Sequence, residues 1–521
     1  MNKAYVDPDQ SAHAFSQYTP LKENEYSVNI PLGTKGLIFK RVTGWLNILQ
    51  PFRGSLILGN PGSGKTKTIV HNYVKQFIEK GFVTALYEYK DDYLSQLAFH
   101  TMQANQRVFT KKYGVKATFH AVNFMSPIHS ARCNPFAGHQ LVDIVDARQA
   151  AASILCNLNK TWIEQRGNFF VELSIDYLTA CLWFLKRYTD DQPERHQSSE
   201  TLTSLEKASQ TQPVNYCSLP HLVEFVGQSY QTVFGLLETL PELTSIIQPL
   251  RDCFEKGVDT ESFDHLEGVL AATRIGLSRL ATPELYWIMT GEEPLVTIND
   301  PQSPKIICLI NDPANSSAYN VPLALAATQV SRQINKRDDH QKAFIIDELP
   351  TIYLEGLDHL LATSRGNKVA TCLSMMDLQQ MEHHYGKKLV TAISMLSATI
   401  ITGSLLLSGD RVAHLLNDQE AGEKPRITAE MLNALPYGYF AGKIEPTMID
   451  GEEGKQTFIT QIPQPSIPWS TTPESTILPV HPGLDGLSSE QVELIFLENM
   501  ELIRDQIADI IRSAGSQKNH S

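Results

Sequence analysis

The sequence predicts an α/β domain that is interrupted by an inserted all-α domain. Strand-like apolar runs alternate with helical patterns over Gly54–Phe124, which is typical of α/β folds. Between Val142 and Met289 apolar residues recur at helical spacing and runs of β-branched residues disappear, which indicates helices only. The alternating pattern returns at Lys305–Ile310 and continues to Ile401. The all-α segment is therefore an insertion between two parts of one α/β domain.

Individual elements can be placed along these two α/β parts. A first short strand is predicted at Tyr26–Ile30. The first part contains strands at Ser55–Leu58, Phe82–Tyr87 and Thr118–Phe124, a helix that begins near Gly64, and a helix near Tyr93–Met102. The second part contains strands at Lys305–Ile310, Ala343–Ile346, Val369–Ser374 and Ala398–Ile401, and helices at Pro322–Ile334 and Leu357–Arg365.

These patterns divide the chain into five segments. We expect an N-terminal segment (1–50), a first α/β part (51–141), an all-α domain (142–292), a second α/β part (293–460) and a tail (461–521). Residues 189–215, within the all-α domain, are polar and almost without apolar side chains, so we expect a mobile loop there.

The tail has two parts with different composition. Gln461–Gly486 carries many prolines and is predicted to be an extended tether. Ser489–Arg512 is an amphipathic helix with its isoleucines on one side. We expect this helix to pack on the α/β domain of its own chain, and docking on another protein is the alternative.

Composition excludes some classes of protein. The 521-residue chain is 42% hydrophobic and 19% charged, which is an ordinary globular balance for several domains. Its formal net charge of −13 argues against a protein that coats nucleic acid with its whole surface. A local basic channel remains compatible with that charge, because net charge does not fix its distribution.

The cysteines and the apolar runs indicate the compartment. Seven scattered cysteines form no metal-site spacing, and Cys308 and Cys372 lie in apolar strand-like runs. We therefore expect reduced, buried thiols, as in the cytoplasm. We also expect no signal peptide after Met1 and no membrane-spanning helix, because no uncharged apolar run is long enough.

A phosphate-binding motif follows the first buried strand of the α/β pattern. Its glycines allow backbone N–H groups to converge on an anion, and the positive end of the next helix faces the same phosphates. The lysine can bridge terminal phosphates, and the threonine hydroxyl can ligate Mg²⁺. The predicted nucleotide-binding residues are Gly59, Asn60, Pro61, Gly62, Ser63, Gly64, Lys65, Thr66 and Lys67.

Two acids supply the expected second half of this site. Asp347 and Glu348 end the apolar run Ala343–Ile346. Asp347 is predicted to hold the Mg²⁺ shell, and Glu348 to orient or deprotonate the attacking water as a general base. This prediction requires the motif and the acids to lie on neighbouring strands that end at the same edge of the sheet.

The residues after Asp347 carry a resemblance to a known family. They read IIDELPTIYLEGLDHLLATSRGNKVATCLSMMDLQQMEHHYG, and the chain also contains NILQPFRGSLILGNPGSGKT, NLNKTWIEQRGNFFVE and LSRLATPELYWIMTGEE. From about Tyr26 to Gly442 the chain resembles the TraG/TraD-type coupling ATPases of conjugation and type IV secretion, most of all those of Bacteroides-like conjugative elements.

The resemblance implies a fold, an activity and partners. It implies a RecA-like P-loop NTPase of the additional-strand, catalytic-Glu type that uses ATP and Mg²⁺ and assembles as a hexamer. The expected cargo is DNA, single-stranded more than duplex, carried by a relaxase and delivered to the ATPases and channel of a secretion system. The expected location is the cytoplasm, at the inner membrane through partners. Arg365 falls where the family has an arginine proposed to reach a neighbour's nucleotide.

Two departures from the family keep other functions open. The family usually has a sensor glutamine where this chain has Met376, and Gln379 and Gln380 are the candidates to substitute for it. The family also normally begins with transmembrane helices. These departures motivate an alternative, a weakly hydrolysing nucleotide-binding receptor or adaptor whose tail helix docks on a partner. A further alternative is a soluble duplex DNA translocase of the FtsK–HerA kind.

Overall fold

The computed structural model of the chain describes ten stretches, residues 20–35, 40–137, 141–192, 215–256, 261–291, 297–338, 340–417, 427–445, 456–467 and 478–518. The chain forms two compact units. The first comprises Met1–Ala121, Thr297–Ala314 and Val330–Pro479, and the second comprises Val122–Val296, Asn315–Gln329 and Val480–Ser521. Residues 193–214 of the predicted mobile loop and residues 468–477 of the predicted tether lie outside the described residues.

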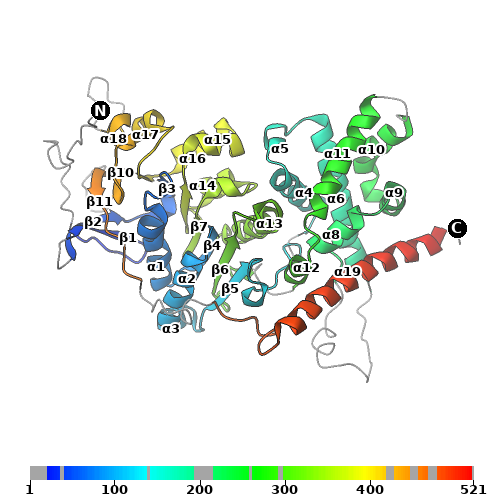
Figure 1. The fold of residues 1–521 in the computed structure, drawn as a ribbon, viewed down its shortest axis with the longest axis horizontal. Coiled ribbons are helices and arrows are strands. Elements are labelled where there is room, and N and C mark those ends of the chain that lie inside the picture. Colours follow the sequence, from blue (N-terminus) through cyan, green and yellow to red (C-terminus); the bar gives the residue numbers. More distant parts are fainter. Residues whose placement is uncertain are drawn as a thin grey trace. The chain divides into compact units, whose positions relative to one another are not determined.

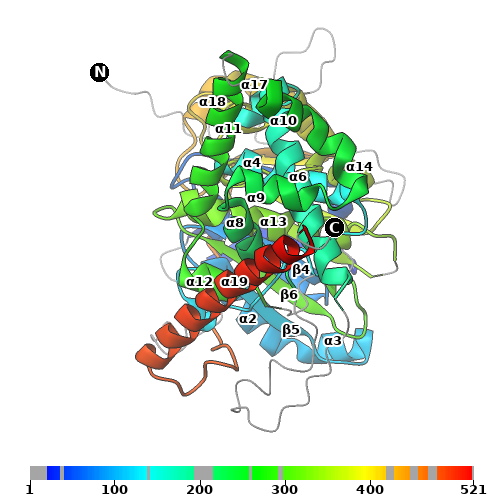
Figure 2. The same ribbon diagram turned by 90° about the vertical axis from the view of Figure 1, so that its right-hand side faces the viewer.

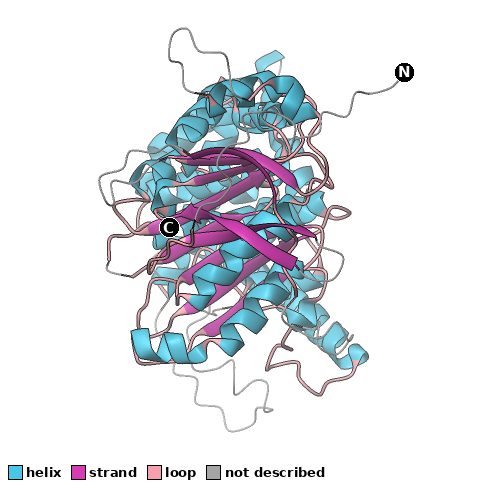
Figure 3. Cartoon of the chain, turned by 90° about the vertical axis from the view of Figure 1, so that its left-hand side faces the viewer, coloured by secondary structure: helices cyan, strands magenta, loops and turns pink. Residues whose placement is uncertain are grey.

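The first unit is built on a nine-stranded mixed sheet (Figures 1 and 3). The strands from β9 to β6 run parallel, and β10 runs antiparallel to both of its neighbours. In spatial order the strands are β11 (Gln456–Gln461), β10 (Tyr439–Ile444), β9 (Thr399–Thr402), β3 (Ser55–Leu58), β8 (Val369–Met375), β7 (Lys342–Ile346), β4 (Val83–Tyr89), β6 (Lys305–Asn311) and β5 (Thr118–Asn123).

The central strands form because helices cover both of their faces. Every residue of β3, β6, β7, β8 and β9 is buried. This explains why these strands appear in the sequence as continuous apolar runs instead of alternating patterns. One face packs on α1 (His71–Glu79) and α2 (Tyr93–Ala104). The other described helices of this unit are α3 (Gln106–Tyr113), α14 (Leu357–Thr363), α15 (Leu378–Tyr385), α16 (Lys387–Leu396), α17 (Gly409–Leu416) and α18 (Ala429–Asn433).

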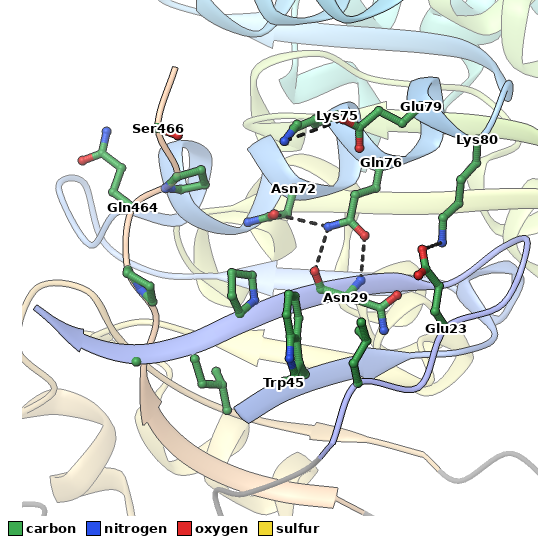
Figure 4. A pocket seen from close by; sticks show the side chains of 16 residues that line it. Glu23, Asn29, Trp45, Asn72, Lys75, Gln76, Glu79, Lys80, Gln464 and Ser466 are labelled. Atoms are coloured by element: carbon green, nitrogen blue, oxygen red, sulfur yellow. Dashed lines mark hydrogen bonds and ion pairs between the residues drawn. The ribbon is translucent and has the colours of Figure 1, made fainter. Parts of the chain in front are cut away.

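A separate hairpin packs against α1. Its strands β1 (Val28–Lys35) and β2 (Lys40–Ile48) pair antiparallel. The Gln76 carboxamide of α1 replaces a neighbouring strand at the outer edge of β1, because its Oε1 accepts from Asn29 N–H and its Nε2 donates to Asn29 O, both at 2.8 Å (Figure 4). Pro31, the next residue facing that edge, has no N–H to offer. The edge is therefore protected from pairing with another strand.

The second unit is helical in the part of the chain that the structure describes (Figure 2). Helix α13 (Ser316–Ile334) contributes residues to both units. None of the described helices is long and apolar enough to cross a bilayer. The helices of the second unit are α4 (Ile144–Leu158), α5 (Thr161–Glu164), α6 (Phe169–Asp190), α8 (Leu219–Val226), α9 (Tyr230–Leu237), α10 (Thr244–Lys256), α11 (Glu261–Ser278), α12 (Pro283–Met289) and α19 (Ser489–Lys518).

The C-terminal helix α19 packs with one side against other helices of the second unit (Figure 2). Phe496 lies 4.9 Å from Trp287 of α12, measured between ring centroids. Gln506 Oε1 lies 2.8 Å from His221 Nε2 of α8, and the aliphatic residues on the same side of α19 are buried. The expectation that this helix packs on the α/β domain was therefore wrong. The apolar stripe finds its complementary surface on the all-α helices.

The cysteines bear out their prediction where their side chains are described. Cys133, Cys156, Cys181, Cys217, Cys308 and Cys372 are buried free thiols. Burial raises the pKa of Cys181 and of Cys308, so these groups stay protonated and behave as small apolar side chains.

Candidate active site

The phosphate-binding loop joins β3 to the helical segment Thr66–Val70, whose first turn has π geometry. Gly62 has φ +79° and Gly64 has φ +94°, a region that favours glycine. The base of the loop is fixed by two backbone hydrogen bonds. Gly59 N–H donates to Met376 O at 3.2 Å, and Asn60 N–H donates to Ser404 O at 2.9 Å. The loop is thus held between the ends of β8 and β9.

The loop and the two acids converge on each other. Lys65 Nζ lies 2.6 Å from Glu348 Oε1, and the two side chains are only 5% and 4% exposed. The Thr66 hydroxyl donates to the Asp347 carboxylate, at 2.9 Å from Oδ2 and 3.1 Å from Oδ1. Side chains from segments nearly three hundred residues apart therefore form one cluster at the carboxyl edge of the sheet.

One part of the geometric expectation needs correction. The motif strand β3 and the acid strand β7 are not neighbours, because β8 lies between them and pairs with both. The two strands still end at the same edge. Lys65 and Thr66 begin the helical segment, and their side chains extend past the end of β8 to the acids.

The Asp347 carboxyl is unusually basic. Burial is the main cause and the neighbouring Glu348 charge adds to it, so the pKa of Asp347 rises to about 6. Lys65, Ser374 and Thr66 oppose this rise without reversing it. A buried carboxylate with a single nearby cation is an arrangement that a divalent metal ion would stabilise.

Glu348 has a backbone conformation that a non-glycine residue adopts only when it is held there. Its φ and ψ are 63° and 56°, in the left-handed region. A chain of hydrogen bonds holds its carbonyl. Asn311 Nδ2 donates to the Tyr87 hydroxyl at 2.8 Å, which lies 2.7 Å from Thr351 Oγ1, and Thr351 donates to Glu348 O at 2.6 Å. Residues of β4, β6 and the turn after β7 thus together hold the Glu348 backbone in this conformation.

A cavity of about 270 Å³ opens on this cluster. Residues 61–67 of the loop line it together with both acids. Gly59 and Asn60 do not line the cavity, and their backbone N–H groups anchor the loop. The Ser63 hydroxyl is buried and has no hydrogen-bond partner among the described residues. The complete lining is Pro61, Gly62, Ser63, Gly64, Lys65, Thr66, Lys67, Tyr89, Lys90, Asp91, Tyr93, Asp347, Glu348 and Tyr437.

Arg365 lies elsewhere. It is exposed in the turn that joins α14 to β8, at the amino end of that strand, whereas the cavity lies at the carboxyl ends. Arg365 lines a separate small cavity with Arg53, Met395 and Glu445, among others. It is therefore not part of the nucleotide cavity of its own chain.

The strand between the motif and the acids carries a polar residue that the sequence analysis overlooked. Met376 and the two glutamines do not line the cavity, and Gln379 and Gln380 are exposed on α15. Ser374, by contrast, is fully buried on β8, one residue beyond the pairing of Leu373 with Ile346. That register places it beside Asp347, and its hydroxyl lowers the pKa of the carboxyl. A lone serine within an apolar strand was the signal for it.

The fold and this cluster define a RecA-like P-loop NTPase fold that carries an inserted helical unit. Residues 302–420 match the family model described as type IV secretion-system coupling protein DNA-binding domain. Over these residues the chain is therefore similar to type IV secretion-system coupling proteins, and the resemblance to coupling ATPases inferred from the sequence motifs is confirmed.

Solved structures of a coupling protein have the same fold. The bacterial conjugative coupling protein TrwBdeltaN70 in an unbound form aligns with a TM-score of 0.56 at 13% identity, over 80% of this chain and 86% of that one. TrwB in complex with ADP and Mg²⁺ aligns with a TM-score of 0.54 at 13% identity, over 81% of this chain and 87% of that one. No curated protein matches the sequence.

Proposed function

We propose that this protein is an ATP-driven coupling protein that recruits nucleoprotein cargo and delivers it to a type IV secretion channel. The observation that carries this proposal is the cluster in which Lys65 and Thr66 meet Glu348 and Asp347. The family match over residues 302–420 supports the choice of DNA as cargo, and the fold shared with TrwB supports a nucleotide-driven protein.

The residues of the cavity fit MgATP. The N–H groups of the glycine loop would bind the phosphates, and Lys65 would exchange its bond to Glu348 for a bond to a terminal phosphate. Thr66 and Asp347 would hold Mg²⁺, which supplies charge neutralisation for the phosphates. Glu348, once released from Lys65, would orient and deprotonate water as the general base.

A neighbouring subunit would complete the site. Arg365 is exposed and far from the cavity of its own chain. In a head-to-tail ring its guanidinium would reach the nucleotide of the next subunit and stabilise charge on the transferring phosphoryl group. We therefore propose a hexamer as the active form, with single-stranded DNA and its relaxase as the cargo.

ATP hydrolysis with and without DNA tests this proposal. We expect the wild-type protein to hydrolyse ATP, single-stranded DNA to stimulate it, and added salt to weaken the stimulation because phosphate contacts release counterions. Lys65→Ala should abolish the activity. A wild-type protein that hydrolyses no ATP under any DNA condition would refute the motor and leave the nucleotide-binding receptor. Stimulation by duplex DNA alone would favour a duplex translocase.

A further inference from the structure

Tyr437 is a large aromatic side chain that lies exposed at the rim of the nucleotide cavity. It is 60% exposed and lines the cavity, although it comes from a loop far from both motifs in sequence. The loop joins α18 to β10. An exposed aromatic ring beside a binding cavity is a candidate contact for a ligand.

The ring is fixed against the phosphate-binding loop. Gly438 N–H donates to Ser63 O at 3.4 Å, a backbone bond that ties the two loops together. A Cβ at Gly64 would lie 3.3 Å from Tyr437 Cε2, so the ring packs directly on the Gly64 backbone. The position of this aromatic side chain is therefore set by the same loop that would bind the phosphates.

The strand order places Tyr437 opposite the acids. Asp347 and Glu348 follow β7, which lies on one side of the loop strand β3, whereas β9 and β10 lie on the other side. Ala441 of β10 pairs with Thr402 at the end of β9, so β10 begins at the carboxyl edge of the sheet. Along that edge the order is acids, phosphate-binding loop, tyrosine.

We propose that Tyr437 is the platform on which the nucleotide base stacks. This inference rests on the proposed function. When the terminal phosphates lie between Lys65 and the acids, the rest of the nucleotide extends along the loop to its other side, where Tyr437 presents its ring. Aromatic rings stack on nucleobases because every base offers a π-face.

The other aromatic side chains of the cavity are less suited to this role. Tyr89 ends β4 and Tyr93 begins α2, beyond the acids on the side of the terminal phosphates. Tyr93 is also engaged already, because its hydroxyl lies 2.7 Å from His71 Nδ1 and Lys67 Nζ lies 5.5 Å from its ring centre. Tyr437 is the aromatic residue of this lining on the side opposite the acids.

Stacking predicts a substrate class. A ring platform tolerates any base and holds large bases better than small ones. We therefore expect purine nucleoside triphosphates to bind better than pyrimidine ones, and ATP and GTP to bind with similar affinity.

Binding of MgATP and of Mg²⁺–tripolyphosphate, which has no base, tests the proposal by calorimetry. Tyr437→Ala should weaken MgATP by about 5- to 150-fold and leave tripolyphosphate unchanged. Tyr437→Phe should bind both as the wild type does. Leu407→Ala, which removes another exposed apolar side chain near the same sheet edge, should also bind both normally. Circular dichroism of each variant shows that it is folded.

The outcomes separate this inference from the proposed function. The base platform is overturned if Tyr437→Ala binds MgATP as the wild type does, or loses MgATP and tripolyphosphate to the same extent. Lys65→Ala should lose both ligands. If the wild-type protein binds neither ligand, the proposed function fails and the platform fails with it.

Discussion

The Lys65 ammonium and the Glu348 carboxylate form a buried ion pair with 2.6 Å between Nζ and Oε1. A buried pair of this kind is stable only while both charges are matched, because removing one partner leaves an uncompensated charge. The same geometry places the proposed general base within reach of the cation that would bind the phosphates. Nucleotide binding and activation of Glu348 are thereby linked in one contact.

Glu348→Gln is expected to separate binding from hydrolysis. The carboxamide keeps the shape of the side chain and its hydrogen bond to Lys65 but cannot accept a proton. We expect turnover to fall by about 10²- to 10⁴-fold while MgATP affinity is kept. Single-turnover hydrolysis and equilibrium binding measure the two quantities. Normal turnover in this variant would show that Glu348 is not the base.

Thr351→Val is expected to slow hydrolysis without weakening binding. The change removes the hydroxyl that connects Tyr87 to the Glu348 carbonyl, so the strained conformation of Glu348 loses one of its supports and keeps the backbone bond from Thr351 N–H. Loss of one such hydrogen bond predicts a turnover about 10-fold lower. Thr351→Ser retains the hydroxyl and should retain activity. Equal activity of the valine and serine variants would contradict the role of the relay.

Arg365→Ala is expected to abolish ATP hydrolysis. Mixing this variant with Lys65→Ala, which is also inactive, is expected to restore part of the activity. Lys65→Ala subunits still carry Arg365, so mixing the two inactive proteins creates interfaces with one complete site. We expect ATPase activity to reappear on mixing under conditions of assembly. An active Arg365→Ala protein, or mixtures that stay inactive although mixed rings form, would argue against an arginine supplied in trans.

His221 is expected to make the second unit sensitive to acid. Burial lowers the pKa of His221 from 6.5 to about 4, with Gln506 opposing the shift. The unfolded chain therefore binds a proton at a higher pH than the folded one. The buried neutral imidazole therefore adds to the free energy of unfolding in full above pH 6.5. This stabilisation, about 3 kcal/mol, is lost as the pH falls towards 4.

Denaturant unfolding between pH 7 and pH 4 tests this dependence. His221→Gln replaces the imidazole with a group that does not titrate, so its unfolding free energy should fall less over the same range. His71, whose pKa is also lowered to about 4, contributes equally to both proteins and cancels. Parallel curves for the wild type and the variant would refute the assignment to His221.

Much of the central sheet was predictable because buried parallel strands are local features of the sequence. The observed bounds of β3 coincide with the prediction Ser55–Leu58, and β7 begins one residue earlier than predicted. The outer strands β10 and β11 were not predicted, since they pair antiparallel at the edge and lack a continuous apolar run. The antiparallel edge depends on tertiary pairing that no short pattern records.

The site shows the same division between local and tertiary information. Motifs identified Lys65, Thr66, Asp347 and Glu348, and the structure brings these four side chains together. Thr351 follows Glu348 by three residues. Ser374 and Tyr437, by contrast, lie beside the site because of contacts between distant segments. Such contacts leave only weak traces in the sequence, such as one serine within an apolar strand, so sequence reasoning passed over them.

The proposed binding mode places a magnesium nucleotide between the Gly59–Thr66 loop and the two acids. It is tested by the dependence of ATP affinity on Mg²⁺ in the wild type and in Asp347→Asn. We expect Mg²⁺ to tighten ATP binding by at least about 10-fold in the wild type and to have little effect in Asp347→Asn, which has lost the charge of a proposed ligand. An unchanged response to Mg²⁺ in Asp347→Asn would contradict the account.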